Sequence, residues 1–300
     1  MIQSTTPELH HHTVKGKNLI LTIILNVGIT LAELIGGIFS GSMALISDAT
    51  HNFSDVLSLI ISYIANKLTG RKATNNQTYG FRRSEIVAAF INSATLIILA
   101  IFILIEGSKR LLHPVTVSAD WVIWLALASI IVNGLSVLFI HKDTHDNMNI
   151  KSAYLHLFSD LLTSIAVLTG GLAMKYLGWF RLDSIFSILI AVYLLYTSWG
   201  ICKSALRIIM QFTPEHLDIQ EVVKEIEQIK EIKNIHHVHA WQINEHDIMF
   251  EAHADLLKDI SVSEFAPVLL KIKQALSQHN INHVTIQPEY AVDDKKEIIY

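Results

Sequence analysis

Long apolar runs separated by short polar stretches fill the first two thirds of the chain. Each run has about 20 residues, the number that an α-helix needs to cross the hydrocarbon of a bilayer. The runs cover residues 19–39, 43–65, 85–107, 121–140, 153–174 and 182–205. This pattern predicts an α-helical membrane protein, with six transmembrane helices in a domain over residues 18–208 that follows a short cytoplasmic tail over residues 1–17.

Beyond Pro214 charged residues return and the apolar runs shorten. Apolar positions at helical spacing predict helices over residues 215–229 and 263–278, and alternating positions predict strands over residues 235–243, 247–255 and 283–287. The order αββαβ is that of small ferredoxin-like or metallochaperone-like α+β domains, with the helices on one face of the sheet. We therefore expect a cytoplasmic domain over residues 209–291, followed by a loose polar tail over residues 292–300.

Lysine and arginine are unequally distributed between the two ends of the predicted helices. Only Lys109, Arg110, Lys175 and Arg181 fall on one side, and all the others near the helix ends fall on the other side. Positive residues concentrate on the cytoplasmic side of membrane proteins. We therefore expect an integral, multi-pass protein of the cell (inner) membrane, with both termini in the cytoplasm.

Composition supports a membrane protein and excludes several other classes. The chain is 51% hydrophobic and 17% charged, and its mean hydropathy is +0.40. A net charge of −4 gives no reason to expect nucleic-acid binding, and the single Cys202 excludes an intramolecular disulfide. The chain has neither the H-E-x-x-H string of metalloproteases nor the G-x-x-x-x-G-K-[S/T] string of nucleotide-driven pumps. We therefore do not expect an enzyme.

One polar motif occurs twice inside the apolar runs. The stretch THNFSDVLS at residues 50–58 recurs as LHLFSDLLT at residues 155–163, which pairs His51 with Asp55 and His156 with Asp160. Residues four apart lie on one face of a helix. Two such helices packed face to face would bring together two imidazole nitrogens and two carboxylate oxygens. This donor set suits a tetrahedral ion, with zinc as the leading candidate and cobalt or cadmium as alternatives.

The alternative is a purely structural role, in which these polar residues only form hydrogen bonds between helices. The repetition favours a metal site, because ionisable residues inside a bilayer are costly and an ion compensates them directly. Since the four ligands lie on separate helices that can move relative to one another, we expect the ion to be in transit. Asp48 is interpreted as a proton acceptor or an outer partner of the site, with a water-exposed cavity residue as the equal alternative.

These residues resemble the cation diffusion facilitator family, and in particular its zinc-type His/Asp branch. The resemblance covers nearly the whole chain. Its motifs are N-x6-E at Asn26 and Glu33, the two H-x-x-x-D pairs, YGFRRSE at residues 79–85, HHVHAW at residues 236–241 and HVTIQPE at residues 283–289. The resemblance implies a homodimer in membrane lipid that exports a divalent ion, foremost Zn²⁺, from the cytoplasm by alternating access and in exchange for protons. No prosthetic group is implied.

The resemblance also implies a second, regulatory zinc site in the cytoplasmic domain. His236 and His253 match metal-binding positions of the family, and Gln287 and Glu289 match two further ligand positions. Because a neutral amide is a poor zinc ligand, we expect Glu289 and His283 to complete the site. Strict strand alternation would place His236 on the face opposite to its neighbours 237 and 239. The alternative is that the histidines stabilise the dimer through ordinary hydrogen bonds.

Other polar segments are open to two interpretations. The loop with His141, Asp143, His145 and Asp146 either hands metal to the transport site or is simply solvated, and His10, His11 and His12 either collect metal or form a disordered tail. The loop over residues 66–83 has no His, Asp, Glu or Cys, so we expect no metal site there. Two other functions remain as alternatives, namely a proton-coupled carrier of a non-metal substrate and a membrane-anchored metal sensor.

Overall fold

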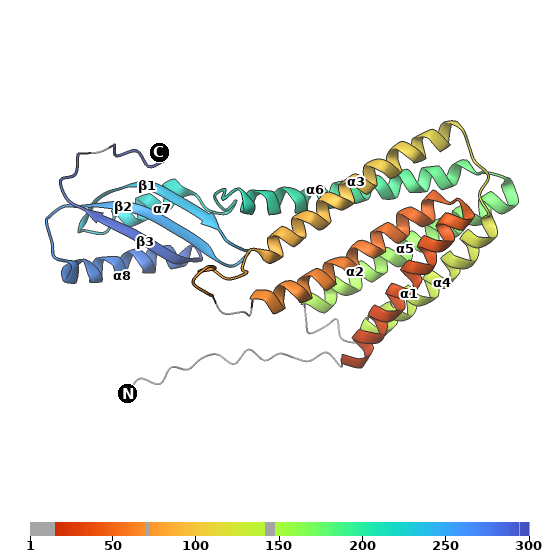
Figure 1. The fold of residues 1–300 in the computed structure, drawn as a ribbon, viewed down its shortest axis with the longest axis horizontal. Helices are drawn as coiled ribbons and strands as arrows, with labels where there is room; N and C mark the ends of the chain where they lie inside the picture. Colours follow the sequence, from red (N-terminus) through yellow and green to blue (C-terminus); the bar gives the residue numbers. More distant parts are fainter. Residues whose placement is uncertain (1–15, 70–72, 142–147, 294, 300) are drawn as a thin grey trace. The chain divides into compact units, whose positions relative to one another are not determined.

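The structure is a computed structural model that describes residues 16–69, 73–141, 148–293 and 295–299, apart from some side chains within the helices. Long helices come first in the chain, and a small sheet with two shorter helices follows them (Figure 1). The chain divides into two compact units. The first comprises Met1–Leu59 and Thr95–Ser198, and the second comprises Ile60–Ala94 and Trp199–Tyr300.

Each of the predicted apolar runs lies within one helix. These helices are α1 (Gly16–Ser40), α2 (Met43–Thr69), α3 (Ser84–Leu112), α4 (Ala119–His141), α5 (Met148–Leu177) and α6 (Arg181–Ile209). Among the described residues, three stretches are long and apolar enough to cross a membrane, namely Ser84–Leu112, Ala119–Leu138 and Arg181–Ile209. The helices are therefore confirmed, whereas six membrane crossings stay a prediction.

A carboxylate from α6 holds the first turn of α2. Asp183 accepts hydrogen bonds from the backbone N–H groups of Met43 and Ala44, at 2.8 and 3.3 Å, and from the hydroxyl of Ser42. The first N–H groups of a helix have no partner within the helix, and the helix dipole favours a negative charge there. Since Asp183 is only 2% exposed, this contact fixes where the helix that carries His51 begins.

The second unit contains the small α+β fold. Its elements are α7 (Ile219–Glu227), β1 (Ile232–Gln242), β2 (Ile248–Leu256), α8 (Val262–Gln278) and β3 (Ile281–Glu289). The strand order is β1-β2-β3, with β1 antiparallel and β3 parallel to β2. Helix α7 packs along β1, α8 packs along β3, and the two helices contact each other, so both cover one face of the sheet (Figure 1). The predicted αββαβ order is confirmed.

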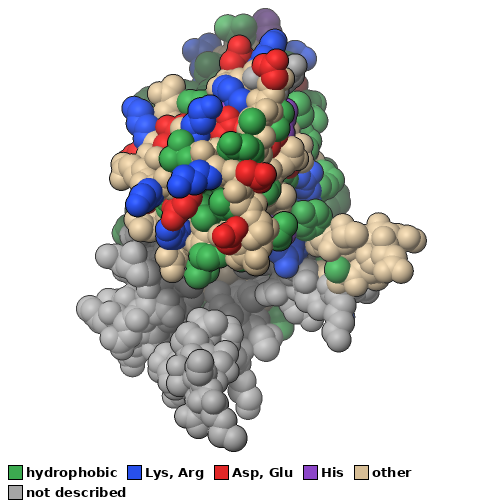
Figure 2. All heavy atoms as spheres, turned by 90° about the vertical axis from the view of Figure 1, so that its left-hand side faces the viewer, with side chains coloured by type: hydrophobic (Ala, Val, Ile, Leu, Met, Phe, Trp, Pro, Cys, Tyr) green, Lys and Arg blue, Asp and Glu red, His purple; other side chains and the backbone are tan. Residues whose placement is uncertain are grey.

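Burial separates the inside of this fold from its surface. Ile226, Ile235, Phe250, Ile272 and Leu276 are almost fully buried between the helices and the sheet. In Figure 2, Lys and Arg side chains alternate with Asp and Glu side chains over the described face. Such a mixed charged surface is typical of a part of a protein that faces water.

A β-bulge interrupts β1 at its histidines. His236 pairs with His253 and His239 pairs with Glu251, so two residues of β1 lie opposite one residue of β2. His237 takes the extra position with a left-handed φ of 51°. The bulge resets the alternation, and the rings of His236 and His237 both contact the ring of His253, with centroids 5.4 and 4.8 Å away. The prediction that His236 points away from its neighbours was therefore wrong.

The C-terminal tail contacts β1, contrary to the prediction of a loose segment. The N–H groups of His237 and Val238 donate hydrogen bonds to the carbonyl groups of Glu297 and Ile298, at 3.1 and 2.7 Å. The side chain of Ile298 packs against the core of the domain. Strand β1 lies at the edge of the sheet, where backbone groups need partners from outside the sheet, and the tail supplies them.

Candidate metal sites

The two H-x-F-S-D motifs lie on α2 and α5, and one residue from each faces the other. His51 Nε2 is 3.5 Å from Asp160 Oδ1, and their side chains are 11% and 6% exposed. The ring of Tyr193 on α6 lies edge-on to the His51 ring, with centroids 5.7 Å apart. The side chains of Asp55 and His156 lie outside the described residues, so the structure places half of the predicted transport site.

Two further carboxylates surround this pair. Asp48 is 2% exposed and Glu33 on α1 is fully buried. Glu33 accepts a hydrogen bond from Asn52 Nδ2 at 3.2 Å, and the charges of Glu33, Asp48 and Asp160 interact. The burial of Asp48 argues against the alternative interpretation that it is a water-exposed residue of a cavity. Ionised carboxylates gathered in a buried region are costly without a cation, and a divalent ion at His51 and Asp160 would supply one.

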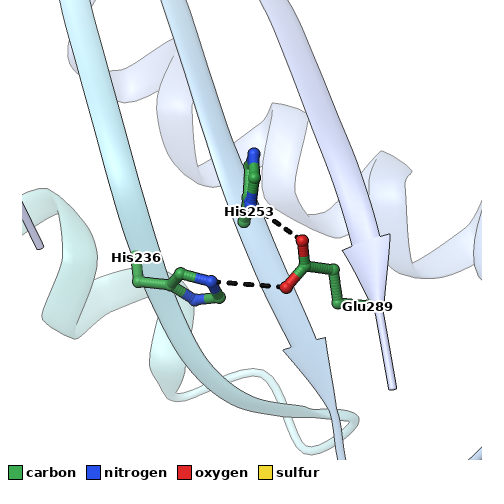
Figure 3. Close-up of side chains that lie close together, drawn as sticks. All are labelled: His236, His253 and Glu289. Carbon is green, nitrogen blue, oxygen red and sulfur yellow. Dashed lines mark ion pairs between the residues drawn. The ribbon is translucent and has the colours of Figure 1, made fainter. Parts of the chain in front are cut away.

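In the α+β fold, one residue from each strand converges on a single point. His236 on β1, His253 on β2 and Glu289 on β3 point toward one another (Figure 3). His236 Nε2 lies 3.3 Å from Glu289 Oε2, and His253 Nδ1 lies 2.8 Å from Glu289 Oε1. One donor atom from each residue lies within 4.8 Å of the others, and this is the one such group of three or more found among the described residues.

Neighbouring side chains hold His236 in the form that binds metal. Asp255 accepts a hydrogen bond from Asn234 Nδ2 at 3.1 Å, which leaves Asn234 Oδ1 directed at His236 Nδ1, 2.9 Å away. Since an amide oxygen can only accept, His236 Nδ1 carries a proton, so in the neutral ring the lone pair lies on Nε2, which faces Glu289. An outer partner that fixes the tautomer in this way is a regular feature of metal-binding histidines.

His253 also fits a metal ligand. Its buried Nδ1 has no hydrogen bond within the described part of the chain, although Glu289 Oε1 is only 2.8 Å away. When this nitrogen is unprotonated, its lone pair faces a carboxylate oxygen, and a metal ion between the two would bind both. Two imidazoles and one carboxylate form a donor set that suits zinc. Gln287 Nε2 donates a hydrogen bond to Glu289 Oε1 at 2.9 Å and so helps to orient that carboxylate.

His283 is a correction to the predicted cytoplasmic set. It pairs with Met249, whereas Gln287 pairs with His253, so His283 lies four residues back along β3. At about 3.3 Å per residue this is roughly 13 Å, too far for a shared ion. The ring of His283 instead lies edge-on to that of Tyr79, with centroids 6.4 Å apart. The remaining predicted positions, His10 to His12 and the His141–Asp146 loop, lie outside the described residues or, for His141, have an undescribed side chain.

Comparison with known families accounts for almost the whole chain. Residues 19–210 match the cation efflux transmembrane domain. Residues 214–291 match the cytoplasmic domain of cation efflux proteins. The two matches meet where the apolar runs end and the α+β fold begins.

Matches to known proteins extend over most of this chain and over most of each relative. The "Cadmium, cobalt and zinc/H(+)-K(+) antiporter" of Bacillus subtilis is 34% identical over 93% of this chain and 91% of its own. The "Metal cation efflux system protein CzcD" of Cupriavidus metallidurans is 33% identical over 94% and 90%. The "Zinc transporter ZitB" of Escherichia coli is 31% identical over 92% and 88%.

Proposed function

This chain belongs to the cation efflux family, and from that premise we propose that it exports divalent transition-metal ions, foremost Zn²⁺, in exchange for protons. The names of its relatives support this proposal, since they include a zinc transporter and an antiporter of cadmium, cobalt and zinc. The observation that carries it is the approach of His51 to Asp160 across α2 and α5. Asp55 and His156 complete the proposed transport site from the same two helices.

The exchange follows from the chemistry of the ligands. An imidazole binds a metal ion only through an unprotonated nitrogen, and a carboxylate binds it most strongly when ionised. Protons and the metal ion therefore compete for the same atoms. When the site opens to an acidic outer side, protons displace the ion, and when it opens to the cytoplasm, the ion displaces the protons. The chain works as a homodimer in the cell membrane, with both termini in the cytoplasm.

The cytoplasmic cluster gives the protein a second, regulatory metal site. His236, His253 and Glu289 supply its three donor atoms, and Asn234 sets the tautomer of His236. Two imidazoles and a carboxylate leave a fourth position of a tetrahedral zinc ion for water or another ligand. A bound ion there would respond to the cytoplasmic zinc level, and it takes no part in the transport step.

The direct test is metal-driven proton flux in proteoliposomes with zinc, cadmium, cobalt, manganese and magnesium. Zinc should drive flux in the unaltered chain. The Asp160→Ala variant should lose it by at least about 100-fold, since even an outer-shell change at a metal site costs 10–100-fold. Asp120→Ala is the matched control, because Asp120 is exposed and its ion pair among the described residues is with Lys175 at the surface. It should keep the flux of the unaltered chain.

Two results would contradict the proposal. If Asp160→Ala transports as well as Asp120→Ala, the repeated motifs are not the transport site. If zinc binds but drives no flux in the unaltered chain, the protein is not an exporter and the membrane-anchored sensor becomes the better explanation.

A further inference from the structure

A lysine from the C-terminal tail reaches the donor atoms of the cytoplasmic cluster. Lys296 Nζ lies 3.4 Å from His236 Nε2 and 3.4 Å from Glu289 Oε2. It also contacts the carboxylate of Asp255, whose two oxygens are 3.1 and 3.2 Å away. The ammonium group therefore contacts two of the atoms that a metal ion would use.

The charges explain why a cation is held there. Asp255 and Glu289 are neighbours across β2 and β3, and their side chains are 5% and 6% exposed. Two nearly buried carboxylates side by side repel each other unless a positive charge lies between them. Lys296 supplies one positive charge, and a divalent metal ion would supply two.

The ammonium group and a metal ion cannot use these atoms together. His236 Nε2 has a single lone pair, which the lysine N–H group now meets and which a metal ion would need. Like charges so close to one another also repel. At 3.4 Å, the lysine contacts to His236 and Glu289 are longer than ordinary hydrogen bonds, so a metal ion replaces weak contacts with stronger ones.

Lys296 is joined to the edge of the sheet through the residues that follow it. Glu297 and Ile298 accept hydrogen bonds from the N–H groups of His237 and Val238, directly after the ligand His236. Displacement of the lysine therefore removes its contacts with Asp255, Glu289 and His236 from the docked tail. The two backbone hydrogen bonds and the Ile298 contact are then what hold the segment to β1.

We propose that Lys296 is a tethered cation that occupies the His236–His253–Glu289 cluster, and that a divalent metal ion displaces it and releases the tail from β1. This inference rests on the proposed regulatory site. It makes the tail a sensor element, because the tail is docked when zinc is scarce and released when zinc is bound. It also sets the zinc concentration at which the site fills. A ligand that must first displace an occupant has an apparent Kd equal to its intrinsic Kd divided by the fraction of open sites.

The first experiment measures zinc affinity in the full chain, purified in detergent with Asp160→Ala present throughout to disable the transport site. A zinc-binding dye serves as the competitor. Lys296→Met keeps the length of the side chain but removes its charge, and it should tighten zinc binding by about tenfold if the tail is docked roughly nine tenths of the time. Lys258→Met is the matched control, because Lys258 is exposed in the loop after β2, and it should bind zinc as the parent chain does.

The second experiment measures release of the tail directly. An endoprotease that cuts after lysine should remove the end of the chain slowly without zinc and severalfold faster with zinc, as measured by mass spectrometry. His253→Ala and Glu289→Gln should each abolish this effect of zinc. Two variants are used so that a folding defect in one does not decide the result.

The outcomes separate the two proposals. If zinc binds the cluster in the parent chain, but Lys296→Met binds it equally well and zinc does not speed tail cleavage, the displacement is wrong and the regulatory site stands. If His253→Ala and Glu289→Gln bind zinc as tightly as the parent chain, the regulatory site itself is wrong and the displacement falls with it. If zinc binds the cluster only weakly even in Lys296→Met, the lysine is a permanent substitute for metal and the displacement is again refuted.

Discussion

At the scale of single residues, buried carboxylates organise both candidate sites. Asp183 satisfies the first N–H groups of α2, the helix that carries His51. Asp255 fixes the orientation of Asn234, which in turn fixes the tautomer of His236. In neither case is the carboxylate itself a predicted ligand. A carboxylate near a metal site thus contributes by placing the neighbouring groups, at the cost of its own desolvation.

Replacement of Asp183 by alanine should destabilise the chain more than loss of an ordinary helix cap. Three donors would lose their partner in a buried place, at about 1–3 kcal/mol for each group left unsatisfied. Asp218→Ala is the matched control, because Asp218 caps α7 in the same way but is exposed, and it should cost about 1 kcal/mol. Thermal unfolding of the full chain in detergent tests this, and equal shifts for both variants would contradict it.

At the scale of elements, helix packing in the first unit depends on glycine. A Cβ atom built on Gly37 of α1 would lie 2.8 Å from Ile46 Cγ1 and 3.1 Å from the Ile46 backbone nitrogen of α2. One built on Gly170 of α5 would lie 2.7 Å from the ring of Phe186 on α6. The sequence alone does not distinguish such contacts from the ordinary glycine content of membrane helices. The structure shows that the helix surfaces approach closely at these positions.

Two glycines of α1 should therefore respond in opposite ways to alanine. Gly37→Ala should destabilise the protein by about 1–3 kcal/mol, because the backbone of α2 cannot move aside as a flexible side chain can. Gly28 has no atom within 4 Å of its built Cβ, so Gly28→Ala should be neutral or stabilising by about 0.5–1 kcal/mol. Unfolding midpoints of the two variants, measured under the same conditions, test this, and an equal loss of stability in both would contradict it.

The start of α8 should weaken in acid. Ser261 and Glu264 form a capping box, and the hydrogen bonds from Ser261 lower the pKa of Glu264 below its usual 4.5. A lowered pKa in the folded state gives stability that is present above the usual value and is lost as pH falls through the folded value. Hydrogen exchange of the first turn of α8 should therefore accelerate below about pH 4.5, beyond the intrinsic pH effect. Glu264→Ala should exchange fast at every pH, and a pH-independent difference from the parent chain would refute the assignment.

At the scale of the whole molecule, membrane and water divide the chain by composition. Exposed apolar side chains line α3 and α6, among them Ile98, Phe102, Leu189 and Tyr196. Such a surface is unfavourable in water and ordinary in lipid. The α+β fold has the opposite character, with its apolar residues inside and mixed charges outside (Figure 2). The family organisation, a membrane domain followed by a cytoplasmic domain, agrees with this division.

The positive-inside distribution predicts which side each end of a helix faces. Cys202 is the single cysteine, so Cys202→Ser provides a background without reactive thiols. In that background, a cysteine in place of Lys258 should react with a membrane-impermeant maleimide only from the cytoplasmic side. A cysteine in place of His113, which follows α3, should react only from the opposite side. Labelling of both positions from one side would overturn the predicted topology.

Most of the elements could be predicted from local patterns. Helices appear as long apolar runs, strands as alternation, and the ligand pairs as a repeated motif, because these properties depend on residues that are close together in the sequence. The αββαβ order followed from the same reasoning. His236, His253 and Glu289 were identified through resemblance to a family, and the structure brings the three together.

What the sequence alone determined was therefore the kind of protein, its elements and the residues that carry the chemistry. Only the tertiary structure decided which of these residues meet. Three features depend on the register of β1, β2, β3 and the tail. They are the bulge that turns His237 toward His253, the exclusion of His283, and the contact of Lys296 with the cluster. Register is set by packing and hydrogen bonds between segments distant in sequence, and a shift of one residue moves a side chain to the other face of the sheet.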